Sequence, residues 1–243
     1  MLNNLRKAIR KPGKALRYIR FFLHHLFRRR KGTLVFIGAE SGGMFSLMHR
    51  GFEKSFVFEA NPYRFEGLKQ KFGGDPHIEI HHVAVADHDG EIQFNISNNN
   101  NGASSSIGTF KEEWDQQYNS RKIEMVESVT VRCINLANFL SQKGVTHIDE
   151  YVSDIQGMDL TVLKTMKSWI DEKRIGAITC EVAKDGRENI YRDLPPNNQS
   201  GFEELLGKNY TLVASGWGVI PDGTFERIPP SAWEMDCRWK VNS

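Results

Sequence analysis

The stretch Leu34-Val35-Phe36-Ile37-Gly38-Ala39-Glu40-Ser41-Gly42-Gly43 decides the fold class of this chain. Its first part, together with Thr33, is a short apolar run typical of a buried strand, and the run breaks on glycine. Glycine allows a tight turn and a close approach of the backbone to a ligand. A second apolar run, Ser55–Phe58, ends at Glu59, twenty-one positions beyond Gly38. An acid at that distance accepts hydrogen bonds from ribose hydroxyls in dinucleotide-binding folds, so the pattern predicts a site for an adenosine-type cofactor.

Apolar runs and helical patterns alternate along the chain, which indicates an α/β fold with a mainly parallel sheet. We expect strands at 34–37, 55–58, 78–85, 91–96, 126–133, 151–153, 176–180, 210–215 and 224–228. We expect helices at 44–50, 62–72, 135–143, 160–173 and 202–206. The polar segment 97–106 predicts a flexible surface loop or, as the functional alternative, a lid that folds over a ligand.

The composition is that of one domain with a sizeable core, because 40% of the 243 residues are hydrophobic. The three cysteines, Cys133, Cys180 and Cys237, are widely spaced and odd in number. They form neither a disulfide framework nor a metal-binding knuckle, which favours a reducing compartment and a cytoplasmic location. We therefore assign residues 32–243 to a single domain.

Residues 1–31 form a basic segment, with eleven Lys or Arg and no acid, which leaves a net charge of −9 on the rest. Its aromatic and aliphatic residues alternate with the cations, and no run reaches the roughly 18 apolar residues that cross a bilayer. The interrupted apolar run also argues against a secretory signal. We expect an amphipathic N-terminal arm that lies on an anionic membrane surface or contacts a protein partner. The alternative is a helix packed on the core with solvated cations; nucleic acid is the less favoured partner.

Five short blocks, in order and at consistent spacing, resemble FkbM-type S-adenosylmethionine-dependent methyltransferases, which methylate hydroxyl groups, often on sugars. The blocks are Gly38-Ala39 with Gly42, Phe58-Glu59-Ala60-Asn61-Pro62, Val83-Ala84-Val85-Ala86-Asp87, Gly102-Ala103-Ser104-Ser105-Ser106 and Ser153-Asp154-Ile155-Gln156-Gly157-Met158-Asp159. The resemblance implies that residues 32–243 are one methyltransferase domain with the Rossmann-like class I fold. That fold has a mainly parallel sheet, helices on both faces and an antiparallel C-terminal strand pair.

The resemblance also implies a site for S-adenosylmethionine, with S-adenosylhomocysteine as the product. Glu59 would hold the ribose, and the third block would line the adenine. The cofactor-binding residues implied are Gly38, Ala39, Glu40, Gly42, Glu59, Ala60, Asn61, Ala86, Asp87 and Asp154.

The sequence departs from the family at four positions. Phe36 stands where the family usually has an acid, and Glu40 where it usually has asparagine; Gln156 and Asp159 stand where glutamates are usual. Phe36 removes one polar anchor of the cofactor's amino-acid portion. The Glu40 carboxylate could replace it by pairing with the methionine ammonium, and the alternative is that Glu40 faces solvent.

Candidate catalytic residues follow from the carboxyl ends of the strands, where open α/β sheets place their reacting groups. Asp154 directly follows the strand 151–153 and is our first candidate base, with capping of the next turn as the alternative. Glu181 ends the neighbouring strand and would raise the basicity of Asp154 or help to hold Mg²⁺. Because two carboxylates are few ligands for Mg²⁺, we expect no required metal. His82, within the predicted strand 78–85, is a second candidate base, although packing is the commoner role of such a histidine.

The predicted activity is O-methylation of a sugar hydroxyl in a glycan, glycolipid or related acceptor, and the basic arm would dock the enzyme on a membrane or a partner glycosyltransferase. Ser105 and Trp217 are candidate substrate residues, because an indole packs well against the C–H face of a sugar; burial is the alternative for Trp217. Two other functions stay open. The arm fits a nucleic-acid methyltransferase, and Phe36 fits a methyltransferase fold that has become a non-catalytic binding module.

Overall fold

The computed structural model of the chain describes residues 30–112, 122–186, 190–217, 228 and 232–243. The predicted N-terminal arm, except its last two residues, lies outside this part of the chain. Within the described residues, no helix has both the length and the apolar character needed to span a bilayer.

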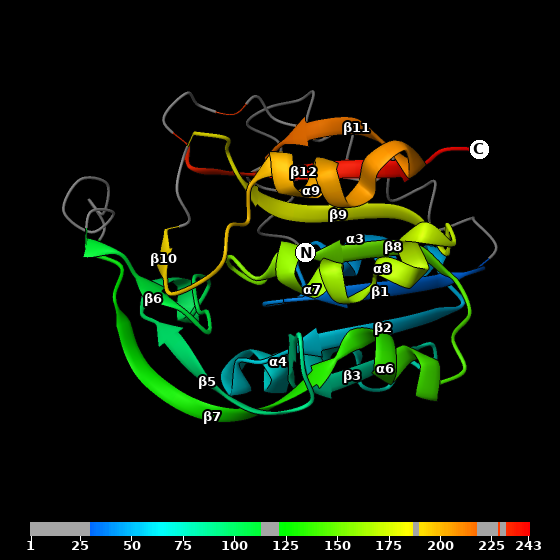
Figure 1. The fold of residues 1–243 in the computed structure, drawn as a ribbon. Coiled ribbons are helices and arrows are strands. Elements are labelled where there is room, and N and C mark those ends of the chain that lie inside the picture. Colours follow the sequence, from blue (N-terminus) through cyan, green and yellow to red (C-terminus); the bar gives the residue numbers. More distant parts are fainter. Residues whose placement is uncertain (1–29, 113–121, 187–189, 218–227, 229–231) are drawn as a thin grey trace, which may run out of the picture.

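The centre of the fold is a seven-stranded sheet in the order β11-β12-β9-β8-β1-β2-β3 (Figure 1). Five strands of this sheet pair in parallel: β1 (Thr33–Ile37), β2 (Lys54–Glu59), β3 (Ile78–His82), β8 (Ile148–Ser153) and β9 (Ile175–Ala183). The last two are β11 (Tyr210–Gly216) and β12 (Glu234–Val241), and β12 is antiparallel to both β9 and β11. The predicted mainly parallel sheet with an antiparallel C-terminal pair is confirmed.

One detail of the C-terminal pair differs from the prediction. The strand paired with β11 is Glu234–Val241, whereas we placed it at 224–228. Residues 224–227 lie outside the described residues, and Ile228 belongs to no strand.

Helices cover both faces of the sheet. Successive strand residues point to opposite sides, so the apolar strands offer a surface for packing on each face. Val35 and Ile37 pack in the core beneath one set of helices, and Leu34 and Phe36 in the core beneath the other. The first set is α6 (Leu136–Gln142), α7 (Asp159–Thr165), α8 (Lys167–Asp171) and α9 (Gln199–Leu206). The second is α3 (Phe45–Met48) and α4 (Pro62–Phe72). Figure 1 shows α7, α8 and α9 in front of the sheet and α3 behind it.

Short 3-10 turns complete the helical elements: η1 (His49–Gly51), η2 (Asn99–Asn101) and η3 (Gly207–Asn209). The helix α4 begins where the sequence predicts, because Asn61 caps it and Pro62 occupies its first turn. The Asn61 side chain accepts hydrogen bonds from the backbone N–H groups of Tyr63 and Arg64.

The predicted strand 78–85 is wrong as a single element. It divides at Val83 into β3 and β4 (Ala84–Ala86), which belong to different sheets. β4 pairs with β7 (Met125–Asn135), which also pairs with β5 (Gly90–Ser97). A two-stranded sheet of β6 (Thr109–Phe110) and β10 (Tyr191–Arg192) lies nearby, and both small sheets are on the left in Figure 1. β4 pairs with β7 instead of continuing the main sheet, and apolar alternation alone does not identify the strand partner.

Candidate functional site

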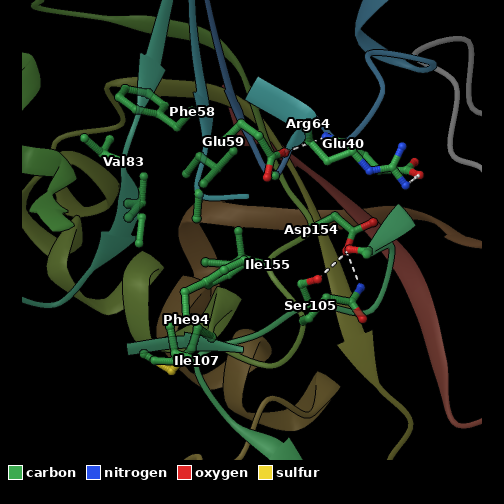
Figure 2. A pocket seen from close by; sticks show the side chains of 18 of the residues that line it. Glu40, Phe58, Glu59, Arg64, Val83, Phe94, Ser105, Ile107, Asp154 and Ile155 are labelled. Atoms are coloured by element: carbon green, nitrogen blue, oxygen red, sulfur yellow. Dashed lines mark hydrogen bonds and ion pairs between the residues drawn. The ribbon is translucent and has the colours of Figure 1, made fainter. Parts of the chain in front are cut away.

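A cavity opens where β1, β2 and β8 end, at the carboxyl edge expected for ligand binding in an open α/β sheet. Figure 2 shows its two contrasting walls, with apolar side chains on the left and charged ones on the right. The charged wall contains Glu40, Glu59, Arg64 and Asp154. The apolar wall contains Phe58, Val83, Val85, Phe94, Ile107 and Ile155. This combination fits a ligand with one flat apolar part and several polar groups.

Gly38 makes the cavity possible, because it brings the loop after β1 against the loop after β8. Its φ is +73°, and a Cβ atom there would lie 1.9 Å from the backbone oxygen of Asp154. The Asp154 N–H in turn donates to the Ile37 oxygen at 3.1 Å. Gly42 also has a φ of +73°, but a Cβ there would meet the Phe72 ring at 2.6 Å, away from the cavity. Gly38 lines the cavity, whereas the predicted cofactor residues Ala39 and Gly42 support the loop from outside the lining.

Glu59 ends β2 and is buried in the cavity wall (Figure 2). Its two carboxylate oxygens accept hydrogen bonds from the backbone N–H groups of Glu40, at 2.8 Å, and Asn61, at 2.9 Å. Burial raises the pKa of Glu59 to about 7. Each oxygen retains a lone pair that can accept from a ligand hydroxyl. Ala60 lines the cavity beside it, while Asn61 acts as the helix cap.

The apolar wall is built by part of the block Val83–Asp87, which the resemblance implies to line the adenine. Val83, Ala84 and Val85 line the cavity, whereas the predicted adenine residues Ala86 and Asp87 do not. The structure therefore does not support the placement of the last two. Ala86 is buried among β4, β5 and β7, and Asp87 is exposed and pairs with His88 at 2.7 Å.

Two carboxylates meet on the far side of the cavity, as predicted, through an intermediary. The Gln156 Nε2 amide donates to Asp154 Oδ1 and to Glu181 Oε2, at 2.7 Å each. Tyr191, from β10, donates its hydroxyl proton to Gln156 Oε1 and so fixes the orientation of the amide. Glu181 lies within β9, which continues to Ala183, so the prediction that it ends the strand is wrong. The carboxylates of Asp154 and Glu181 nevertheless accept hydrogen bonds from the same Gln156 amide.

The environment of these carboxylates makes them weaker acids than usual. Burial raises the pKa of Glu181 well above its ordinary range, and the negative charge of Asp154 adds to the effect. Partial desolvation by the surrounding protein also raises the pKa of Asp154, although the hydrogen bond from Gln156 acts in the opposite direction. Asp159 lies beneath the same loop, fully buried, and accepts hydrogen bonds from the Ser153 hydroxyl and the Ile155 N–H. Burial raises its pKa to about 7.

The remaining predicted site residues divide into one at the cavity and two away from it. Ser105 lines the cavity, and its hydroxyl joins the Ser97 N–H to the Gly102 oxygen. Trp217 is 44% exposed, and its indole N–H donates to the Glu234 oxygen at the start of β12. His82 does not line the cavity; its ring stacks on Phe65 and lies 3.2 Å from the Ala60 oxygen, so the geometry gives no support to its role as a base.

The model of the methyltransferase FkbM domain matches residues 37–206, most of the chain. The chain belongs to the FkbM methyltransferase family. Members of this family are S-adenosylmethionine-dependent methyltransferases, and the resemblance carried by the five sequence blocks is confirmed. None of the curated protein sequences compared with it matches.

Among solved structures, this FkbM-type chain is similar to the methyltransferase FkbM from Methylobacillus flagellatus KT, with a TM-score of 0.52 and 12% identity. The match covers 89% of this chain and 45% of that one, so this chain spans less than half the length of its relative. At this identity the likeness shows the fold, and the predicted class I methyltransferase fold is confirmed.

Two further similar structures have TM-scores too low to support an inference about function. One is an rRNA methylase from Streptococcus thermophilus, with a TM-score of 0.47 and 8% identity over 94% of this chain and 96% of that one. The other is the N-methyltransferase NodS from Bradyrhizobium japonicum WM9 in complex with S-adenosylhomocysteine, with a TM-score of 0.43 and 12% identity over 98% and 91%.

The cavity of this FkbM-type protein fits S-adenosylmethionine. Gly38 leaves room for close backbone approach, Glu59 offers a carboxylate for hydroxyl groups, and the wall of Val83 and Val85 suits an adenine ring. Among the described residues, no three His, Cys, Asp or Glu side chains are grouped so that they could hold a metal ion.

The sequence interpretation did not identify Arg64, Gln156 or Tyr191 as site residues. Gln156 lies within a recognised block, so its position in the chain was a usable signal, whereas Arg64 lies two positions beyond Pro62, outside the second block. Tyr191 reaches the site from the separate strand β10, and no local pattern connects it to Asp154.

Proposed function

We propose that the chain is an O-methyltransferase that transfers a methyl group to a hydroxyl of a sugar, with Asp154 receiving the hydroxyl proton. The observation that supports this most directly is the Asp154–Gln156–Glu181 arrangement at the cavity. A carboxylate with a raised pKa is a better proton acceptor than an ordinary one, and hydroxyl methylation needs such an acceptor.

The bound cofactor supplies an electrophilic methyl group on a good sulfonium leaving group. The protein then has to align the acceptor oxygen with that methyl group, which can lower the barrier by up to about 7–11 kcal/mol. Gln156 holds Asp154 and Glu181 at a fixed separation, and the high pKa of Glu181 leaves one negative charge between the two acids. Asp154 therefore accepts the proton, and Glu181 limits charge repulsion by staying protonated.

Two features favour a sugar as the acceptor. Trp217 presents a half-exposed indole and is tied to Glu234, whose pKa is raised to about 8 by burial and then by the charges of Asp154 and Asp159. The indole N–H donates to the backbone oxygen of Glu234, which is paired with Ala183, two residues beyond Glu181 on β9, and the exposed ring can contact the C–H face of a sugar. Ser105 provides a polar group at the cavity wall.

A transfer assay tests the function. The protein is incubated with methyl-labelled S-adenosylmethionine and a panel of oligosaccharides, glycolipids and RNA, and we expect label in a saccharide. The Asp154→Asn variant should lower the transfer rate roughly a hundred- to ten-thousandfold, more than it lowers S-adenosylhomocysteine affinity. The Glu66→Gln variant, at an exposed position of α4, is the control. Transfer to RNA with none to any saccharide would overturn the proposal.

The basic residues 1–31 support a second part of the proposal, attachment of a cytoplasmic enzyme to an anionic membrane surface or to a glycosyltransferase. Sedimentation with vesicles of neutral or anionic lipid tests the attachment to a membrane. The full chain should bind anionic vesicles, and binding should fall as salt is added. Equal binding to neutral vesicles would contradict an electrostatic attachment.

A further inference from the structure

We propose that Arg64 and Glu40 together bind the amino-acid end of the cofactor, with Arg64 taking its carboxylate and Glu40 its ammonium. This proposal rests on S-adenosylmethionine being the cofactor, and it assigns to Arg64 a role that the sequence pattern does not reveal. The amino-acid end is a zwitterion, so its complement is a pair of opposite charges a few ångströms apart.

Arg64 has the features of a group that lacks its ligand. It lies in the first turn of α4, lines the cavity, and has only 10% of its side chain exposed. Its Nη2 atom is 3.0 Å from Glu40 Oε1, yet neither Nη2 nor Nε makes a directed hydrogen bond among the described residues. Leaving buried guanidinium N–H groups unsatisfied is costly, and a guanidinium binds a carboxylate through two parallel hydrogen bonds.

Glu40 is the more exposed partner of this pair. Its side chain is 47% exposed, and its backbone has a φ of +50°, in the left-handed region that non-glycine residues rarely adopt. The backbone N–H of the same residue donates to Glu59 Oε2, so the strained conformation links the proposed zwitterion site to the proposed ribose site. Such strain is found most often at ligand-binding loops.

The core explains why an anchor is needed in this place. Phe36, at the position where the family usually has an acid, is buried and packs edge-on against Phe45 at 5.6 Å between ring centroids. It cannot contribute a charge to the site. The Arg64–Glu40 pair, on the charged wall in Figure 2, supplies both charges from the loop after β1 and the start of α4.

Two ligands separate binding of the amino-acid end from general damage to the site. S-adenosylhomocysteine carries the zwitterion, and 5′-methylthioadenosine has the nucleoside and sulfur without it. By isothermal titration calorimetry, Arg64→Met should weaken S-adenosylhomocysteine binding roughly ten- to a hundredfold and leave 5′-methylthioadenosine within about twofold. Glu40→Gln should show the same selectivity. Lys69→Met, an exposed cation on the same helix, should change neither affinity.

The outcomes distinguish the proposal from the function on which it rests. If Arg64→Met weakened the binding of both ligands equally, or of neither, the proposal would be overturned. The role of Arg64 would then be to hold the loop after β1 against α4. Thermal unfolding of each variant shows whether the fold is retained, and Arg64→Lys gives a milder replacement that keeps the charge. If the wild-type protein bound neither ligand at millimolar concentration, the cofactor assignment itself would be wrong and this proposal with it.

Discussion

At the scale of single residues, Glu59 should control cofactor affinity. Glu59→Gln removes the charge and turns an amide N–H toward one of the two backbone donors that the carboxylate now satisfies, those of Glu40 and Asn61. Hydrogen bonds to a charged group contribute about 1.5–3 kcal/mol, so the S-adenosylhomocysteine affinity should fall roughly ten- to a hundredfold at pH 8. Calorimetric titration measures this change.

The same residue should make binding depend on pH. The pKa of Glu59 is raised to about 7, and the ionised carboxylate is the better acceptor for ribose hydroxyls. Wild-type affinity should therefore decrease as the pH falls from 8 through 7 to 6, whereas Glu59→Gln should show a flatter profile. Lys69→Met serves as the control and should follow the wild type. If Glu59→Gln kept the full wild-type pH dependence, another group would be responsible for it.

The residue scale also shows how much of the site could be predicted from sequence. Gly38 and Glu59 were accessible, because a turn that excludes a Cβ atom and an acid at a strand end leave fixed marks in the chain. Arg64 was not, since its importance lies in two buried guanidinium nitrogens, Nε and Nη2, that make no directed hydrogen bond. Burial of that kind is a property of the folded molecule.

At the scale of elements, a buried ion pair ties the antiparallel strand β12 to the parallel sheet. Arg238, 2% exposed, donates from both terminal nitrogens to the two carboxylate oxygens of Glu150 on β8 and also to the Thr179 hydroxyl on β9. The guanidinium thus spans three neighbouring strands. Breaking a buried pair by removing one partner costs more than the pair contributes, because the other charge is left buried.

Arg238→Met should therefore lower the free energy of unfolding by about 3–5 kcal/mol. The double variant Arg238→Met with Glu150→Met should recover much of that loss, since no buried charge then lacks a partner. Urea denaturation of the wild type, both single variants and the double variant gives the coupling energy. Additive losses in the double variant would argue against a direct interaction across the three strands.

The positions of the helices and strands were predicted better than the pairing of the strands. The main strands and the start of α4 follow from apolar runs and from the Asn61-Pro62 cap, which are local signals. The division at Val83 was missed because no turn residue marks it and only the pairing with β7 separates the two halves. Likewise, the predicted helix 160–173 is interrupted at Met166, a fully buried residue, where packing overrides a continuous helical pattern.

At the scale of the whole molecule, the acids around the cavity should make the fold less stable as the pH rises. Burial raises the pKa values of Glu59 and Asp159 to about 7 and that of Glu234 to about 8, all above their usual values near 4. The folded protein thus binds more protons than the unfolded chain in this range. Their contribution is complete below the unfolded pKa and is lost as the pH rises through the folded pKa.

His49 sets the lower limit of the pH range in which the buried acids control the stability of the fold. Burial lowers its pKa to about 4, so its contribution to stability is present above its unfolded pKa of 6.5 and is lost as the pH falls. Between pH 6.5 and 8.5 the acids therefore dominate among these groups. One pKa unit corresponds to about 1.4 kcal/mol, so the free energy of unfolding should fall by roughly 2–3 kcal/mol across this window.

Asp159→Asn tests this account without touching the cavity lining. An asparagine can still accept from the Ser153 hydroxyl and the Ile155 N–H through its carbonyl oxygen, and it has no charge to bury. The fall in unfolding free energy between pH 6.5 and 8.5 should become smaller by about 1 kcal/mol, measured by urea denaturation at both pH values. Glu66→Gln, on the exposed surface of α4, should leave the wild-type slope unchanged. A steeper fall in Asp159→Asn would contradict the sign of the argument, because it would mean that ionised Asp159 stabilises the fold.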